Sequence, residues 1–169
     1  ENEVMDFPLG TVLVKTFSLP ANPANREGAE TIIETRLLIN RSNGWKALPY
    51  YWETTNDAQL AISGKTIEDV SLIHNGETKT FDYAMPSAGQ CTKCHSVLPL
   101  AESGETQGIF KPIGPKARFL NNDYTYENGT ENQLTHWVNA GILTGVPSDL
   151  NTIDTAATFT DSDTPSAMS

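Results

Sequence analysis

The stretch that decides the fold occupies residues 31–53 and reads TIIETRLLINRSNGWKALPYYWE. In Thr31–Asn40 the side chains alternate between two faces, the pattern of a β-strand. Asn43-Gly44 is a strong hairpin signal, because a type I′ turn needs positive φ at both central positions. Trp45–Glu53 then forms the return strand. The stretch therefore predicts an antiparallel hairpin.

Further short strands are predicted on both sides of this hairpin. Gly10–Phe17 alternates and is rich in β-branched residues, and Asp57–Ser63 is a second short apolar run. A second hairpin is predicted from Val70–His74 to Thr78–Ala84 around a turn at Asn75-Gly76. Short strands with turns at regular spacing predict an antiparallel β sandwich or barrel-like domain.

The pattern changes at Met85-Pro86, after which we expect helices and long loops. The clearest predicted helix begins with Thr130 as its N-cap, and Gln133 completes a capping box. Gly141 suits the C-terminal end of that helix. Residues after Pro147 are acidic and rich in Ser and Thr, a composition typical of a linker or an extended wrap.

The chain holds its only two cysteines in Cys91-Thr92-Lys93-Cys94-His95. A CxxCH string is the attachment signature of c-type haem: the thiols add to the haem vinyl groups and the imidazole binds the iron. On a helix these three side chains share one face. A structural zinc site needs four ligands, a thioredoxin-type CxxC does not need the histidine, and a disulfide leaves His95 unexplained. We therefore predict one covalent haem c, with His95 as proximal ligand.

The motif and the change of pattern together predict an α+β fold in three parts. Residues 1–86 form an N-terminal antiparallel β sandwich or barrel-like domain that serves as a scaffold or docking module. Residues 87–147 form a mainly α, cytochrome c-like haem domain. Residues 148–169 form an acidic tail that acts as a linker or supplies the distal ligand.

Composition limits the partners and the compartment. The chain has 169 residues and a net charge of −10, which argues against nucleic acid or an anionic membrane surface and suits a basic redox partner. No run of about 18 apolar residues is present, so we expect no transmembrane segment. Thioether attachment is completed outside the bacterial cytoplasm, so we expect an exported periplasmic or extracellular protein whose leader has been removed.

Several stretches together resemble a family of predicted dihaem c-type cytochromes of unassigned physiological role. They lie between residues 6 and 147 and read FPLGTVLVKTFSLP, IETRLLIN, GWKALPYYW, IHNGE, FDYAMP, QCTKCH and NQLTHWVNAGILTG. The resemblance implies a haem protein that continues on both sides, with a second CxxCH downstream. This chain has one CxxCH, which indicates a fragment of a longer protein or a single-haem relative, and allows a larger multihaem assembly.

Other residues are candidates for the haem surroundings. In c-type domains a carbonyl of the Gly-Pro loop accepts a hydrogen bond from the proximal imidazole, which points to the stretch ending at Pro115. Arg118 is a candidate for a propionate contact, because a planar guanidinium binds a carboxylate through two hydrogen bonds. Trp137 lies on the apolar face of the predicted helix and is a candidate haem contact.

The sixth iron ligand is open between two main candidates. Met168 lies 73 residues after His95, and a thioether ligand would raise the reduction potential. His136 would give a bis-histidine haem of lower potential, and its alternative role is an ordinary hydrogen bond on the helix. Met85 is a weaker candidate, and an open site remains a further alternative.

These residues favour an electron-transfer protein over an enzyme, because the redox chemistry belongs to the haem and no acid–base pair or nucleophile triad stands out. One alternative is a haem enzyme subunit, peroxidase-like or substrate-oxidising, with an open distal site. Another is an assembly module in which the β domain is the functional part and the haem is a conduit. An exposed apolar patch or an unpaired edge strand in residues 9–84 would favour the latter.

Overall fold

The computed structural model describes residues 4–25, 27–97 and 108–156. Contacts divide the chain into two compact units, each treated by itself below. The larger unit is Phe7–Lys111, and the smaller one combines Glu1–Asp6 with Pro112–Ser169. The helix that carries Cys91 and Cys94 therefore belongs to the same unit as the strands that precede it, whereas the sequence predicted a new domain from residue 87.

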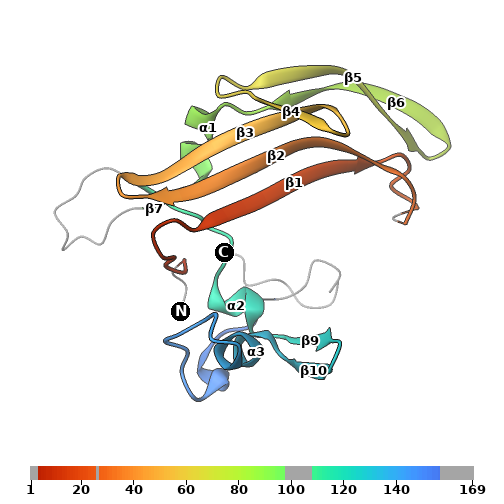
Figure 1. The fold of residues 1–169 in the computed structure, drawn as a ribbon. Helices are drawn as coiled ribbons and strands as arrows, with labels where there is room; N and C mark the ends of the chain where they lie inside the picture. The colour runs from red at the N-terminus through yellow and green to blue at the C-terminus, as the bar shows by residue number, and fades with distance from the viewer. Residues whose placement is uncertain (1–3, 26, 98–107, 157–169) are drawn as a thin grey trace. The chain divides into compact units, whose positions relative to one another are not determined.

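A four-stranded antiparallel sheet forms the body of the larger unit (Figure 1). Its strands follow chain order, so each strand pairs with the next one in the sequence. They are β1 (Val12–Pro20), β2 (Glu30–Arg41), β3 (Gly44–Thr54) and β4 (Asp57–Leu60). The predicted central hairpin is confirmed: β2 and β3 pair antiparallel from Glu34 opposite Tyr51 to Arg41 opposite Gly44.

The turn of that hairpin differs from the predicted one. Arg41 pairs with Gly44, so the two central residues are Ser42 and Asn43. Positive φ occurs at Gly44, at 92°, and not at Asn43, so the type I′ geometry was wrong. A glycine in the left-handed region directly after a turn is the arrangement of a bulged hairpin. Asn75, at 52°, and Gly76, at 79°, do have the positive φ values that a type I′ turn requires.

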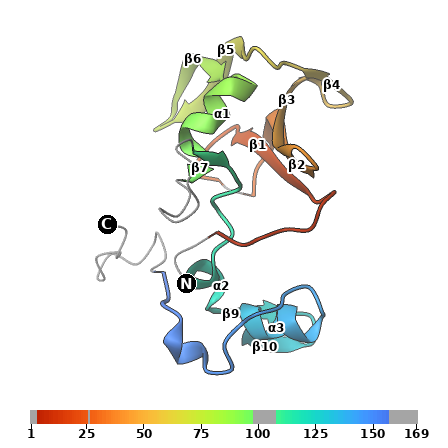
Figure 2. The same ribbon diagram turned by 90° about the vertical axis from the view of Figure 1, so that its left-hand side faces the viewer.

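The second hairpin leads directly into the helix of the CxxCH motif. It consists of β5 (Lys65–His74) and β6 (Glu77–Met85), with a bulge between Ile67 and Val70. After Pro86 the chain enters α1 (Ala88–Cys94), which packs against β3 (Figure 2). β7 (Ser96–Val97) and β8 (Ile109–Phe110) then form a two-stranded antiparallel ladder.

The smaller unit is built from short elements. Its parts are α2 (Ala117–Leu120), β9 (Asp123–Tyr126), β10 (Gly129–Asn132), α3 (Gln133–Asn139) and the 3₁₀ helix η2 (Leu150–Thr152). Its most buried side chains are Leu134, which is fully buried on α3, and Ile153 after η2. The Asn121 side-chain amide donates to the carbonyls of Leu150 and Ile153, at 3.2 and 2.8 Å. Residues up to Ala156 are therefore packed into this unit, although the sequence predicted a linker or wrap from residue 148.

The beginning of α3 was predicted at the wrong residue. Thr130 lies in β10, where its hydroxyl is 3.0 Å from that of Thr125. Asn132 is the N-cap, and its side chain accepts a hydrogen bond from the backbone of Leu134. In the β9–β10 hairpin, Thr130 pairs with Thr125. The residue that local sequence rules assign to the helix N-cap is therefore part of a strand. At the other end, Gly141 has φ of 71° just after the helix, as predicted.

The predicted α+β fold class was wrong: the structure is mostly β, with small antiparallel sheets and few helices, and its larger unit holds a four-stranded sheet in place of the predicted sandwich or barrel. About 47% of the structure is strand and 15% is helix, and the helices after residue 86 have at most seven residues. Instead of a mainly α, cytochrome c-like domain, short helices alternate with small antiparallel ladders. Short polar strands such as β9 and β10 carry little hydrophobic periodicity, so the sequence pattern did not separate them from loops. Within the described part of the chain, none of the helices has the length and apolar character needed to span a membrane.

Gly64 provides a test of the junction between β6 and α1. At its φ of 80°, a Cβ would lie 2.8 Å from the Met85 carbonyl oxygen and 2.9 Å from the Ser87 nitrogen. Gly76 has a similar φ of 79° but nothing within 4 Å of that position. Both alanine variants lose about 1 kcal/mol from the left-handed backbone. We expect Gly64→Ala to lose at least about 1 kcal/mol more, because it must also displace the chain entering α1. Urea unfolding of both variants checks this, and equal losses would contradict the close approach.

Candidate haem attachment site

The CxxCH motif lies on a helix with a well-formed N-terminus. The Ser87 hydroxyl accepts a hydrogen bond from the backbone of Gln90 at 3.2 Å. The Gln90 side-chain carbonyl accepts one from the backbone of Ser87 at 2.8 Å. This reciprocal pair is a capping box, and it fixes the point where the helix begins. The cysteines therefore follow an ordered first turn.

The two thiols are free and differ in exposure. Cys91 is half-buried, and its thiol donates to the Ser87 carbonyl at 3.5 Å, whereas Cys94 is exposed. Burial raises the pKa of the Cys91 thiol, so Cys91 is in its neutral, protonated form near pH 7. The two thiols are not bonded to each other, as addition to vinyl groups requires, and they lie three residues apart on one helix.

His95 is the C-cap residue of α1, and the small ladder behind it fixes its backbone. Its N–H donates to the Cys91 carbonyl at 2.9 Å, and its own carbonyl accepts from the backbone of Lys111 at 2.7 Å. Its ring meets the edge of Phe110, with the ring centroids 5.9 Å apart. The ring is thereby positioned by both the helix and β8.

The His95 imidazole lacks the hydrogen bond that a core histidine normally has. Its Nδ1 is buried and has no hydrogen-bond partner among the described residues. An unpaired buried nitrogen is unfavourable in an ordinary core histidine, by roughly 1–3 kcal/mol. Among the described residues, His95 thus lacks the acceptor that orients a metal-ligating imidazole, and the fit to a haem rests on the two thiols and on the position of His95 directly after them.

A buried polar cluster joins β2 and β6 in the larger unit. The Glu34 carboxylate on β2 is fully buried and forms an ion pair with Arg36 two residues along the strand. The Tyr83 hydroxyl on β6 donates to the same Glu34 oxygen at 2.6 Å. The Arg36 guanidinium lies over the Phe17 ring, 4.3 Å from its centroid. Sequence reasoning missed this cluster, although a charged pair within an otherwise apolar strand was visible at Glu34 and Arg36.

The three predicted haem-pocket residues belong to the smaller unit, whereas the CxxCH motif belongs to the larger unit. The Pro115 carbonyl accepts a hydrogen bond from the backbone of Met5 at 3.1 Å. Arg118 on α2 lies beside Phe119, and its carbonyl accepts from the backbone of Ala156 at 2.9 Å. Trp137 on α3 is half-buried. The predicted roles of Pro115, Arg118 and Trp137 toward haem stay predictions.

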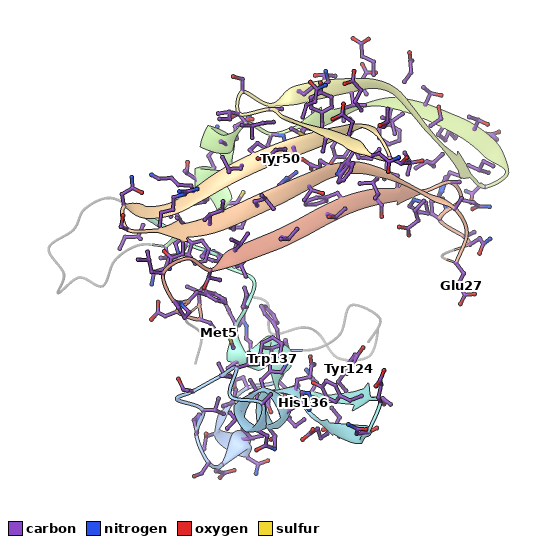
Figure 3. The ribbon with its side chains drawn as sticks, in the orientation of Figure 1. Met5, Glu27, Tyr50, Tyr124, His136 and Trp137 are labelled. Atoms are coloured by element: carbon purple, nitrogen blue, oxygen red, sulfur yellow. The ribbon has the colours of Figure 1, made fainter. Side chains whose placement is uncertain are left out.

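His136 is held in an ordered arrangement on α3. Its Nδ1 lies 2.5 Å from a Glu131 carboxylate oxygen. Its ring stacks on Tyr126, with centroids 3.7 Å apart and planes 13° from parallel. Figure 3 shows His136 on the helix and Tyr124 on the adjoining hairpin. A carboxylate on one ring nitrogen is the usual support for a metal-ligating histidine and leaves Nε2 as the ligand atom.

Met168, the other predicted sixth ligand, lies outside the described residues. The smaller unit contains an apolar cavity of about 260 Å³, whose lining includes Met5, Leu134, Leu143 and Ile153. Within residues 4–25, 27–97 and 108–156, no three His, Cys, Asp or Glu side chains gather as a metal-binding group.

Comparison with protein-family models, with curated proteins and with solved structures finds no match to this chain. The resemblance to dihaem c-type cytochromes therefore stays a prediction from the quoted stretches.

Tyr83 provides a test of the buried cluster through pH. Burial, followed by the hydrogen bond to Glu34 and its charge, raises the pKa of Tyr83 to about 12. The unfolded phenol titrates near 10, so the folded chain binds this proton more tightly. The resulting stabilisation is complete below pH ~10 and is lost as the pH rises through about 12.

We therefore expect the free energy of unfolding to fall more steeply between about pH 10 and about 12 in the wild type than in Tyr83→Phe. Tyr124→Phe, which changes an exposed phenol of the smaller unit, should keep the wild-type slope. Denaturant unfolding across this range measures both slopes, and identical slopes for the wild type and Tyr83→Phe would contradict the bond to Glu34.

Proposed function

We propose that this chain is an electron-transfer protein that carries one covalent haem c. The observation that supports it is the motif itself: two free thiols, Cys91 and Cys94, on a capped helix, followed directly by the imidazole of His95. The haem would supply the one-electron ferric–ferrous couple. The chain would supply attachment, an iron ligand and the electrostatic surroundings.

Attachment needs no external oxidant or reductant. Each thiol adds across one vinyl group: a sulfur–carbon bond forms, and the thiol hydrogen ends on the other vinyl carbon. The half-buried Cys91 and the exposed Cys94 differ in surroundings, so one thioether would lie against the sheet and the other toward solvent. His95 would bind the iron as the proximal ligand.

The setting of this function is part of the proposal. Thioether attachment places the protein outside the bacterial cytoplasm, in the periplasm or beyond. The net charge of −10 favours a basic protein as redox partner, because opposite charges speed the encounter of two proteins. Transient docking of this kind suits an electron carrier, which must release its partner after each transfer.

Covalent attachment is tested by expressing the chain together with a haem-attachment system in a bacterial periplasm. We expect haem to remain with the polypeptide after denaturation, and to be lost in the Cys91→Ala, Cys94→Ala double variant. Ser96→Ala, a neighbouring change outside the motif, should keep the haem. In-gel haem staining and mass spectrometry of the intact chain measure this, and an unmodified wild-type chain would contradict the proposal.

The optical spectrum of the same protein tests the iron ligands and separates the carrier from the enzyme. A low-spin spectrum with the weak far-red band of a methionine ligand, lost in Met168→Leu, would assign Met168. A low-spin spectrum without that band, becoming high-spin in His136→Leu, would assign His136, whose Nδ1 is already paired with Glu131. High-spin features and binding of carbon monoxide in the wild type would instead show an open site and favour a haem enzyme.

A second candidate function is supported by β1, the first strand of the four-stranded sheet. Within the described residues it pairs with β2 alone, so its other edge is unpaired. Val12 and Val14 on this strand are 47% and 64% exposed. An unpaired edge with exposed apolar residues can join the edge of another chain. The second candidate is therefore an assembly module in which copies of the chain pair through β1 and the haem is a conduit between them.

Sedimentation over a range of concentrations tests the assembly module. We expect concentration-dependent association in the wild type and loss of association in Val14→Lys, because a charge at the strand edge opposes pairing. Val138→Lys changes a similarly exposed valine of the smaller unit and is the control. A wild type that stays monomeric at all concentrations would remove this candidate.

A further inference from the structure

The four-stranded sheet of the larger unit has two faces that differ in burial. Because side chains alternate along a strand, the pairing of β1–β4 shows which residues share a face. Glu34 and Pro49, both fully buried, lie on one face, where the Tyr83 hydroxyl on β6 donates to Glu34. We call this face the inner face and the opposite one the outer face.

A bulge in β2 maintains this difference in burial along the sheet. Phe17 pairs with Glu34, and the next residue of β1 pairs with Ile32. Ile33 is thus an extra residue in β2, and such a residue breaks the alternation of the strand. Ile33 is accordingly buried, as Glu34 is, whereas Ile32 is 39% exposed. We therefore assign Ile32 to the outer face.

The outer face is apolar at its centre. Val14 on β1, Leu37 on β2 and Leu48 on β3 lie side by side across three strands. Tyr50 on β3 pairs with Leu60 on β4. Val14 is 64% and Leu60 is 47% exposed, and the other three residues are half-buried. A continuous apolar patch of this kind on a protein surface marks an interaction site.

Polar groups on the outer face pair with one another. The hydroxyls of Thr16 and Thr35 lie 2.9 Å apart, and the Trp52 indole N–H donates to the Thr35 hydroxyl at 2.9 Å. Groups that are already paired can lose their surrounding water without losing a hydrogen bond. Covering this part of the face therefore costs little free energy.

The charges of the outer face favour a second copy of this chain over a basic redox partner. Within the bounds of the strands, its charged residues stand at its two ends, Glu30 at one end and Arg41 and Lys46 at the other. The net charge of −10 opposes contact between two copies, but the centre of this face adds no repulsion. A basic protein would meet only one carboxylate on these strand residues, so charge attraction would be weak.

The area of the outer face is sufficient for a dimer. With about 4.8 Å between strands and about 3.3 Å per residue, β1–β4 cover about 570 Å². Two copies in contact through this face would bury about 1,100 Å², and a specific interface needs about 1,000 Å². Sheets that pack face to face lie about 10 Å apart, a gap that interdigitated side chains such as Leu37 and Leu48 fill.

We propose that the outer face of the β1–β4 sheet is the interface of a symmetric dimer of this chain, with the two sheets packed face to face. Two-fold symmetry brings the same apolar patch together from both copies. This interface differs from pairing through the edge of β1, because it uses side chains of all four strands and no ladder hydrogen bonds. It does not rest on haem attachment, since none of its residues belongs to the CxxCH motif.

Sedimentation equilibrium of the full-length chain over a range of concentrations tests this interface. We expect a monomer–dimer equilibrium in the wild type. Leu60→Lys places an unpaired charge on the outer face of both copies and should weaken the dimer about tenfold or more. Ile73→Lys is the matched control on β5, where the side chain is 42% exposed against 47% for Leu60, and it should keep the wild-type affinity.

Ile32→Lys separates the face from the edge. β2 has a paired strand on each side, so this variant cannot act on an unpaired edge, and it should weaken the dimer as Leu60→Lys does. Association that is weakened by Val14→Lys but by neither of these variants would show pairing through β1 and overturn the proposal. A wild type that stays monomeric at every concentration would overturn it as well. Circular dichroism checks folding, and if one of the two variants does not fold, the other decides.

Discussion

The hydrogen bond from the Tyr83 hydroxyl to the buried Glu34 carboxylate is the interaction on which the larger unit depends. It joins β6 to β2, two strands that belong to different hydrogen-bonded ladders. A carboxylate with no exposed surface is strongly unfavourable unless it is paired, so the bond constrains where β6 can lie. Because α1 follows β6 after Pro86, the same constraint places the CxxCH helix against the sheet.

This arrangement shows how the proposed chemistry can do without a mainly α domain. Haem attachment needs two thiols at a fixed spacing and a histidine directly after them, and a capped helix of seven residues with its C-cap provides these. The four-stranded sheet provides the support that other helices would provide in a helical haem domain. The chemistry is thus carried by a short local segment, and the fold around that segment can differ.

Prediction from the sequence succeeded where one residue or one local pattern is sufficient. The hairpin of Asn75 and Gly76 formed as predicted, because only those two residues must accept positive φ. It failed where neighbours compete for the same residue, as at Thr130, which the β9–β10 hairpin uses in place of the helix. The capping box of Ser87 and Gln90 was missed, although its S-x-x-Q spacing stands directly before the motif.

The sequence by itself determined the CxxCH spacing, on which the proposed haem attachment rests, and the hairpin within residues 31–53, since both are local properties of the chain. Only the tertiary structure decided that α1 belongs with the sheet, that the buried His95 Nδ1 has no partner among the described residues, and that Glu34, Arg36 and Tyr83 come together. Tyr83 follows Glu34 by 49 residues, and no local pattern shows which distant side chains burial will bring together.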